Sequence, residues 1–463
     1  MKECKMIFDK LAINDPTALI FGRAPKPVTT RRGLIIGGGT VYPELNFTLP
    51  TMEIRKETIP EIRTHYEEIV SEALQRAYEL QTNGLVFEFE TLLEMTLDPK
   101  LGVMLVKAMN DICENWYVKK GIKSEIRLTP NDTRDFDRPP RMRTGGHMAE
   151  MLELFEQGAI AGGDLLSIES TGGKEIHDDA LLMCDIKQAM FALTVLGTRD
   201  MHYLWKNIVG IAKKTGKIAG GDTACGFGNT AMVLAEKGYI PKMFAAVIRV
   251  ATVVRTLVAH EEGAIGPDKD CGYEGPYLKA ITGIPISMEG RTASCAHTSP
   301  VGNISSAACD LWSNESVQHL KLLGGMATTV YLEQLEYDTR QMNQATLMGD
   351  HARGIFQKIN IESDIHFDPQ AVVLAPDVVI DIAGKIVSGK NYIDAAKRGT
   401  LRALDIIQER VKSGSLKIGD REIAYIEPLR EEIAKIPEDE SEFVEEMLPE
   451  LDTAKVILSE YGL

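Results

Sequence analysis

The stretch DLLSIES, residues 164–170, is a short apolar run that closes on polar residues, a pattern typical of a buried strand. Apolar residues then recur at helical spacing over residues 178–197, and Gly197 is placed to end that helix. GKIAGGD, residues 216–222, indicates the next strand. A strand, a helix and a second strand in this order predict a parallel βαβ unit.

The same alternation extends to both sides of this unit. Further strands are indicated by GLVFEFE (84–90), SEIRL (124–128) and GIPISME (283–289), and helices are expected near residues 59–82 and 391–414. Repeated βαβ units build either a closed barrel or a doubly wound sheet, and both place their sites at the carboxyl ends of the strands. The sequence therefore predicts an α/β fold with its chemistry at one edge of a parallel sheet.

The charge balance excludes two classes of partner. The 463 residues include 67 Asp and Glu against 51 Lys and Arg, a formal net charge of −16. Because nucleic acids and anionic membranes are bound largely through Lys and Arg, we expect neither. The most apolar segment, residues 243–260, is interrupted by Arg249 and Arg255, which predicts a buried helix rather than a membrane span. The first residues lack the apolar region of a signal peptide, so we expect a cytoplasmic protein.

The seven cysteines do not form a disulfide framework. They are too few and too scattered, and no two of them make a CxxC pair or a zinc-finger spacing: Cys4, Cys113, Cys184, Cys225, Cys271, Cys295 and Cys309. Glycine-rich GGG (37–39) and CGFG (225–228) lack the continuation of a phosphate loop, so nucleotide binding is not expected. We expect a structural or supporting role for His297 and Cys295 in CAHTSP.

Two cysteines differ from the rest because each lies among glycines and acidic residues after a short apolar run. Cys225 lies in AGGDTACGFGNTAM (219–232), and Cys271 lies in GPDKDCGYEGPY (266–277). If both follow strands, their thiols point into one mouth, where Glu169 would add a carboxylate. Two thiolates and a carboxylate make a three-ligand zinc site with the fourth position open for substrate. The alternative is that both are ordinary core cysteines.

Several longer stretches resemble one family. They are KLAINDPTALIFGRAPKPV near the start, DLLSIESTGGKE (164–175), GGDTACGFGNTAM (220–232), GPDKDCGYE (266–274), KAITGIPISMEGRTASCAH (279–297) and CDLWSNESV (309–317). These stretches closely resemble the zinc-containing subunit of methanol:corrinoid methyltransferase, and the resemblance covers most of the chain. It implies a (β/α)8 TIM barrel over residues 81–355, with an N-terminal extension (1–80) and a mainly helical C-terminal segment (356–463).

The resemblance also implies the activity and the partners. One Zn²⁺ per chain would be held by Glu169, Cys225 and Cys271, and methanol would be the substrate. The methyl group would pass to Co(I) of a corrinoid carried on a separate protein, giving methyl-Co(III). The family further suggests a homodimer within a heterotetramer. Gly226-Phe227-Gly228 differs from the more polar family version and would lie beside the alcohol, which makes substrate identity the open point.

The ligand set leads to one more expectation. Two thiolates and a carboxylate around Zn²⁺ give a formal charge of −1, which tempers the Lewis acidity of the metal. We therefore expect a second group that keeps the alcohol oxygen protonated or stabilises the departing hydroxide, and the candidates are Asp222 and Glu274. Their alternative role is to hold the cysteine loops.

Three other functions compete with this interpretation. The first is a zinc corrinoid methyltransferase for another small methyl donor, such as a methoxylated compound, another alcohol or a thiol. The second is a zinc hydrolase, against which the lack of histidine ligands counts. The third is a non-catalytic scaffold for the corrinoid protein.

Overall fold

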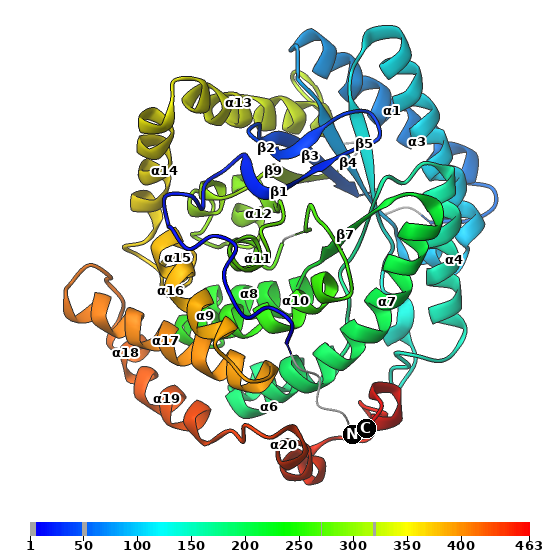
Figure 1. The fold of residues 1–463 in the computed structure, drawn as a ribbon. Helices are drawn as coiled ribbons and strands as arrows, with labels where there is room; N and C mark the ends of the chain where they lie inside the picture. The colour runs from blue at the N-terminus through cyan, green and yellow to red at the C-terminus, as the bar shows by residue number, and fades with distance from the viewer. Residues whose placement is uncertain (1–5, 49–52, 270, 318–320) are drawn as a thin grey trace.

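Seven parallel strands form the central sheet of the protein (Figure 1). The computed structural model describes residues 6–48, 53–269, 271–317 and 321–463. The sheet has the order β7-β6-β5-β4-β3-β9-β8. Its strands are β3 Tyr42–Thr48, β4 Leu85–Glu90, β5 Ser124–Thr129, β6 Leu165–Ile168, β7 Ile218–Asp222, β8 Ser287–Glu289 and β9 Leu311–Val317.

Residues 265–268 close this sheet into a barrel. On one side, the Ile265 N–H donates to the Ala219 carbonyl of β7 at 2.9 Å. On the other side, the Ser287 N–H of β8 donates to the Asp268 carbonyl at 2.8 Å. The segment therefore occupies the position of an eighth strand, and the predicted (β/α)8 barrel is confirmed over the alternative of a doubly wound sheet.

The strand predictions from apolar runs are confirmed at β4, β5, β6 and β7, whereas the run 283–289 forms a strand only at its end, in β8. Two barrel strands, β3 and β9, were not predicted. The boundary expected at residue 81 falls after the first barrel strand, because β3 pairs with both β4 and β9.

Helices cover the outside of the barrel and connect its strands (Figure 1). The longer ones are α1 Ile59–Glu79, α3 Pro99–Lys120, α4 Gly146–Ala161, α5 Lys174–Met183, α7 Thr198–Thr215, α9 Lys242–Ala251, α10 Val253–Glu261, α11 Gly275–Thr282 and α13 Ala327–Leu347. The shorter ones are α2 Leu93–Leu97, α6 Ile186–Phe191, α8 Thr230–Glu236 and α12 Arg291–Ala296. Single turns are the 3₁₀ helices η1 Thr133–Phe136 and η4 Ile304–Ala307 and the π-helices η2 Ala192–Gly197 and η3 Cys225–Asn229.

The segment 178–197 is not the single helix that its periodicity predicts. α5 ends at Met183, because the next residue, Cys184, has a left-handed φ of 53°, and α6 then continues through η2 into α7 without a stop. Gly197 does not end a helix, since its φ is −60°. A Cβ there would lie 3.2 Å from Cδ of Arg255. The glycine instead permits the close approach of this helix to α10.

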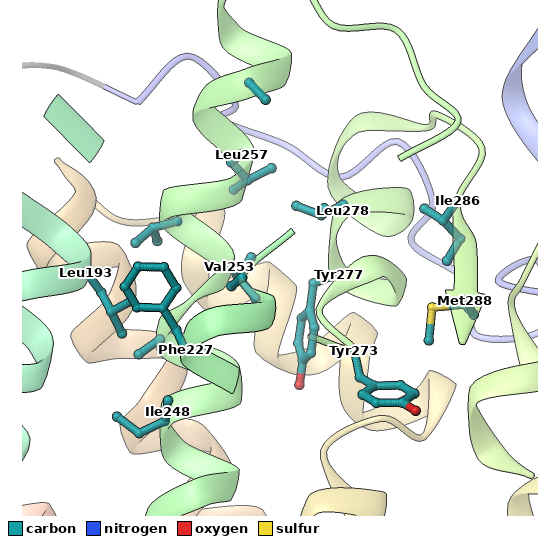
Figure 2. Close-up of a cluster of buried hydrophobic side chains, with 14 of the residues drawn as sticks. Leu193, Phe227, Ile248, Val253, Leu257, Tyr273, Tyr277, Leu278, Ile286 and Met288 are labelled. Atoms are coloured by element: carbon teal, nitrogen blue, oxygen red, sulfur yellow. The ribbon is translucent and has the colours of Figure 1, made fainter. Parts of the chain in front are cut away.

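The helices α9 and α10 form the most apolar stretch of the protein. Residues 242–261 are long and apolar enough, by length and composition, to cross a membrane, and the most apolar 18-residue window within them is entirely buried inside the protein. The buried helix expected at 243–260 is therefore confirmed. Figure 2 shows Val253 and Leu257 of α10 between Leu193 on one side and Leu278 of α11 on the other.

A β-hairpin covers the amino ends of the barrel strands. It consists of β1 Arg23–Thr29 and β2 Ile35–Gly38, which pair antiparallel. Arg32, at its turn, is 2% exposed and donates from Nη1 to the Ser124 carbonyl at 2.7 Å, where β5 begins. The same guanidinium pairs with Glu125 and Asp164. This end of the barrel is therefore filled by paired charges.

The C-terminal segment is helical, as expected, and lies along one side of the barrel, coloured from yellow through orange to red in Figure 1. α16 packs against α11, and α17 packs against α9. Its elements are α14 Asp350–Asp364, α15 Pro369–Val372, α16 Pro376–Val387, α17 Tyr392–Lys412, α18 Asp420–Ala424, α19 Ile426–Lys435, α20 Glu440–Met447, η5 Leu448–Glu450 and η6 Leu458–Tyr461. A short hairpin, β10 Lys321–Leu322 and β11 Gly325–Met326, precedes α13.

Candidate metal centre

Three neighbouring strands deliver the predicted ligands to the mouth of the barrel. Glu169 follows the last residue of β6, and Cys225 lies in the loop after β7. Cys271 follows the segment 265–268 that closes the barrel. Because parallel strands end at the same edge, the three side chains meet at the carboxyl end of the barrel.

The three side chains form a compact cluster. One oxygen of Glu169 and the sulfurs of Cys225 and Cys271 all lie within 4.8 Å of one another. The Cys271 thiol donates to Glu169 Oε1 at 3.1 Å. Cys271 is 2% exposed, whereas the Glu169 side chain is 28% exposed. The structure therefore brings together the three predicted ligands and leaves one side of the cluster open.

Cys225 begins a π-helical turn, η3, rather than an ordinary helix. One turn later, Asn229 Nδ2 donates to the Cys225 sulfur at 3.4 Å. Short π-helical turns are rare and often mark functional sites, because the extra residue re-aims a side chain. Here the turn places both the sulfur and its hydrogen-bond donor at the mouth.

The loop that carries Cys271 is tied to the loop that carries Cys225. The Thr223 hydroxyl accepts hydrogen bonds from the N–H groups of Cys271 and Gly272, at 3.3 and 3.1 Å. A Cβ on Gly272 would lie 2.4 Å from Glu274 Oε2 and 3.0 Å from the Ala224 backbone. Only glycine permits this approach of the two loops.

Asp222 and Glu274, the predicted second groups, are both fully buried and hold these loops. Asp222 accepts from Trp205 Nε1 at 2.8 Å and from the N–H groups of Ser170 and Thr223. Glu274 Oε1 accepts from the Ala224 N–H at 2.6 Å and from the Thr256 hydroxyl at 2.9 Å. These contacts match the loop-holding role named as their alternative, while a catalytic role for either stays a prediction.

A model of the methanol–cobalamin methyltransferase B subunit family matches residues 5–462. The chain belongs to this family. A methanol–corrinoid protein co-methyltransferase of Methanosarcina barkeri (strain Fusaro / DSM 804) is 35% identical over 447 residues, which cover 95% of each chain. The crystal structure of the methanol:cobalamin methyltransferase complex MtaBC from Methanosarcina barkeri contains a chain that superposes with a TM-score of 0.92. That chain is 33% identical, and the match covers 98% of this chain and 99% of the other.

In a member of the methanol–cobalamin methyltransferase B subunit family, the protonation of the three candidate ligands determines what must be displaced when a metal binds. Burial opposes charge on Glu169, but Lys269 and the Cys271 thiol hold the pKa of its carboxyl below the usual value. The contact with Cys271 lowers the pKa of the Cys225 thiol, but burial and Glu169 together raise it to about 12. Burial and Cys225 raise the pKa of Cys271 as well. A metal that binds here therefore displaces protons from both thiols.

Lys269 and Glu88 belong to the mouth and were not identified from the sequence. The Lys269 side chain is 6% exposed, and its ammonium pairs with Glu88 and, at 3.2 Å, with Glu169 Oε1. Burial opposes the charge of Lys269, but the carboxylates of Glu88 and Glu169 raise its pKa well above the usual value. Above Glu88 on β4, burial and the charge of Glu169 raise the pKa of Glu90 to about 8. The only sequence signal for this part of the mouth was that Glu88 and Glu90 lie at the end of the predicted strand 84–90.

The departure from the family at Gly226-Phe227-Gly228 does not place Phe227 beside the substrate. The Phe227 ring is fully buried, stacks edge-on against His177 at 5.0 Å between centroids, and lies under the guanidinium of Arg255. Figure 2 shows the ring among Leu193, Val253 and Ile248, inside the core. The expectation that Phe227 lies next to the alcohol is wrong, because its side chain points away from the mouth.

Cys295 and His297 lie outside the cluster of Glu169, Cys225 and Cys271. Cys295 is exposed on α12, and His297 Nδ1 lies 3.6 Å from Glu289 Oε2. Within the described ranges, neither residue joins a group of potential metal ligands. Their placement agrees with the supporting role expected for them.

The helical turn η6 holds two loops at the mouth. The Gly173 N–H, in the loop that begins at Glu169, donates to the Tyr461 hydroxyl at 3.0 Å. Glu460 accepts from the N–H groups of Arg143 and Thr144, at 2.6 and 3.0 Å, in the loop after β5. A segment from the far end of the sequence therefore fixes the loop that carries one candidate ligand.

Proposed function

We propose that this protein is the methanol-activating subunit of a methanol:corrinoid methyltransferase, with a zinc ion bound by Glu169, Cys225 and Cys271. The observation that carries the proposal is the cluster of these three side chains at the barrel mouth of a chain that belongs to the methanol–cobalamin methyltransferase B subunit family. The substrate is supported by the names of its relatives, a methanol–corrinoid protein co-methyltransferase and the MtaBC complex.

The donor set fits zinc. Cysteine sulfur and carboxylate oxygen are ordinary zinc ligands, and three protein ligands with an open fourth position are typical of catalytic zinc sites. The partly exposed Glu169 marks the open side, where a small molecule can enter. Zinc bound here would supply a Lewis acid that stabilises negative charge on the alcohol oxygen as its bond to carbon weakens.

The residues of the chain hold the proposed ligands in position. Thr223 and Glu274 fix the two cysteine loops against each other, and Asp222 fixes the Glu169 loop through the Ser170 N–H. Cys271 lies at the buried side of the cluster, so an alcohol approaches only from the mouth. The methyl carbon of an alcohol bound in this way would face outward, toward a corrinoid carried by a separate protein.

The mouth must accordingly be covered by the corrinoid protein during transfer. The MtaBC complex of the structural relative supports such a two-protein arrangement. We extend the proposal to a homodimer of this chain within a heterotetramer and to a cytoplasmic location, and both require measurements of the purified complex and of the cell.

Metal content tests the zinc site. The anaerobically purified protein is expected to hold about one zinc per chain, as a single three-ligand site requires, and Cys225→Ala and Cys271→Ala are expected to lose it without unfolding. Cys113→Ala is the matched control, because Cys113 is a buried cysteine of α3 and is expected to leave the zinc content unchanged. A wild-type protein that takes up no zinc when supplied with it would overturn the proposal.

A panel of methyl donors tests the substrate. Methanol, other small alcohols, a thiol and a methoxylated aromatic compound are each supplied with the reduced corrinoid protein, and formation of methyl-Co(III) is followed by absorbance. The proposal expects methanol to give the fastest transfer. Faster transfer from another donor would assign the chain a different methyl source, and turnover of an ester without any corrinoid protein would instead indicate a hydrolase.

A further inference from the structure

Lys269 is a buried cation in direct contact with the proposed zinc site. Its ammonium lies 3.2 Å from Glu169 Oε1, the same oxygen that accepts from the Cys271 thiol. On its other side it contacts Glu88, which also accepts from the Thr129 hydroxyl at 2.8 Å. Since Glu88 is held by β4 and by Thr129, the position of the ammonium is fixed from the barrel wall rather than by Glu169 alone.

The ammonium has a donor left over. A lysine ammonium carries three N–H bonds. Within the part of the chain that the structure describes, its recorded partners are the carboxylates of Glu88 and Glu169. One N–H of Lys269 is therefore available to a further acceptor beside Glu169, which is the place where the proposed function seats the alcohol.

The chemistry of the proposed reaction creates such an acceptor. When the C–O bond of methanol breaks, its electron pair goes to oxygen. Co(I) supplies the electron pair of the new bond to the methyl carbon and becomes Co(III), and the oxygen departs as hydroxide. Zn²⁺ with two thiolates and one carboxylate would carry a formal charge of −1. The negative charge on the departing oxygen would therefore develop beside a centre that is already anionic. A fixed cation at this point stabilises that charge without reorganisation.

We propose that Lys269 is a catalytic residue of this methyltransferase: its ammonium, anchored by Glu88, donates a hydrogen bond to the oxygen of methanol and stabilises the hydroxide as the methyl group leaves. This inference rests on the proposed function and deepens it. It assigns the second group expected from the sequence to Lys269 rather than to Asp222, whose oxygens accept loop hydrogen bonds, or to Glu274, whose Oε1 holds the Cys225 loop through the Ala224 N–H.

A purely structural role for Lys269 predicts a different result. If Lys269 only holds Glu169 in place, its removal disorders a ligand, weakens zinc binding and slows transfer only through lost metal. If Lys269 acts on the substrate oxygen, its removal takes a positive charge away from the metal site. Zinc then binds more tightly, while transfer slows even when the site is full of zinc.

The first experiment compares wild type with Lys269→Met. Zinc affinity is measured by competition with a chelator, without corrinoid protein or methanol, and methyl transfer is measured at saturating zinc. The expected results are zinc binding about tenfold tighter, from removal of a nearby like charge, and transfer about 100-fold slower, as for loss of one preorganised donor. Lys269→Arg keeps the charge and is expected to recover part of the transfer rate.

A second variant keeps the inference testable if Lys269→Met does not fold. Glu88→Gln removes the other carboxylate, so Lys269 competes more strongly with zinc for Glu169. Zinc affinity is expected to fall about tenfold, opposite in sign to the change in Lys269→Met, because the charge change is opposite. Weaker zinc binding in both variants, or normal transfer by zinc-loaded Lys269→Met, would overturn the role of Lys269.

Lys279→Met is the matched control. Lys279 is also buried and paired with an aspartate, Asp310, but it lies at the amino ends of the strands. Its replacement is expected to change stability and to leave zinc affinity unchanged. A wild type without zinc affinity overturns the proposed function itself, whereas zinc binding with equal affinity in wild type and in Lys269→Met overturns only the inference.

Discussion

Lys269 and Lys279 are both buried and both paired with carboxylates, but they lie at opposite ends of the barrel. At the amino end, Lys279 donates to the carbonyls of Ile20 and Ala308 and to Asp310, at 3.0, 2.7 and 2.9 Å. These three acceptors use all three of its N–H bonds. At the carboxyl end, the described residues give Lys269 two carboxylate partners, which leaves one N–H for a further acceptor.

The difference separates stability from function. A buried charge is tolerated when hydrogen bonds and opposite charges surround it. At the amino end of the barrel, Lys279 and Arg32 have such partners, and their side chains close that end of the barrel. The carboxyl end instead keeps two protonated thiols, an ionised Glu169 and an incompletely satisfied ammonium within contact of one another. Buried polar groups that lack a hydrogen-bond partner are typical of sites where a bound ligand supplies the missing partner.

The largest expected effect lies at the mouth. Glu169→Gln removes a metal ligand and leaves the Lys269 ammonium with Glu88 alone. We expect zinc affinity to fall by about 100-fold or more and methyl transfer to be lost, because the carboxylate charge is central to the site. Chelator competition and stopped-flow absorbance of the corrinoid measure both effects. Glu68→Gln, on the exposed face of α1, is the control, and unchanged zinc binding in Glu169→Gln would contradict the site.

The corresponding substitution at the amino end of the barrel should change the stability of the protein and leave its zinc affinity unchanged. Asp310→Asn leaves the ammonium of Lys279 buried without its charge partner. Breaking such a pair costs about 3–5 kcal/mol in free energy of unfolding. Urea denaturation measures the loss, and zinc affinity of the folded variant is expected to match wild type. A change in zinc affinity would show that the two ends are not independent.

Much of this fold follows from the sequence, because four barrel strands are short apolar runs. The strands β3 and β9 were not predicted because polar residues interrupt their apolar pattern. β3 carries Glu44 and Asn46, and β9 carries their register partners Ser313 and Glu315, on the face toward the barrel interior, which breaks the apolar pattern. The closing segment 265–268 contains Gly266 and Pro267. Interior polar groups are satisfied there by tertiary contacts, such as the pairing of Glu44 with Arg127, that periodicity does not reveal.

The candidate ligands could be found from sequence, whereas their electrostatic partner could not. Cys225 and Cys271 stand in glycine-rich loops after strands, and their family motifs add Glu169. The pairing of Lys269 with Glu88 spans 181 residues and exists only once the barrel is closed. Tertiary packing also explains the wrong expectation for Phe227. Its place in the sequence near Cys225 suggested a side chain at the barrel mouth, but its ring lies in the core.

A third case is a buried ring without hydrogen-bond partners among the described residues, and its effect on stability can be measured by changing the pH. His177 is fully buried, and neither ring nitrogen has a hydrogen-bond partner within the described residues. Burial, with Lys174 and Arg255, lowers its pKa to about 3 from the usual 6.5. The unfolded chain therefore binds a proton that the folded protein refuses, and stability falls as pH drops below about 6.5.

His177→Phe is expected to remove this part of the pH dependence. One proton contributes about 1.4 kcal/mol per pH unit between the two pKa values. Urea denaturation at pH 7 and pH 5 should show a smaller loss of unfolding free energy in the variant than in wild type. Equal losses would mean that His177 is protonated in the folded protein.

The smallest effect concerns the hold of η6 on the Glu169 loop. Tyr461→Phe removes the oxygen that accepts from the Gly173 N–H. An unsatisfied buried N–H costs about 1 kcal/mol of stability, and a looser loop is expected to weaken zinc binding by about twofold. Thermal denaturation and chelator competition measure these changes. Tyr78→Phe, at a partly exposed ring of α1, is the control, and a loss of stability with unchanged zinc affinity would confine η6 to a structural role.

The hold of η6 also bears on how the protein is made. Gly173 and Tyr461 lie 288 residues apart, so the ribosome produces Glu169 and both cysteines long before the segment that fixes the Glu169 loop. A nascent chain with all eight barrel strands still lacks this contact. The geometry of the mouth is therefore completed by a segment that is synthesised well after the barrel, and maturation of the site follows translation of the barrel rather than accompanying it.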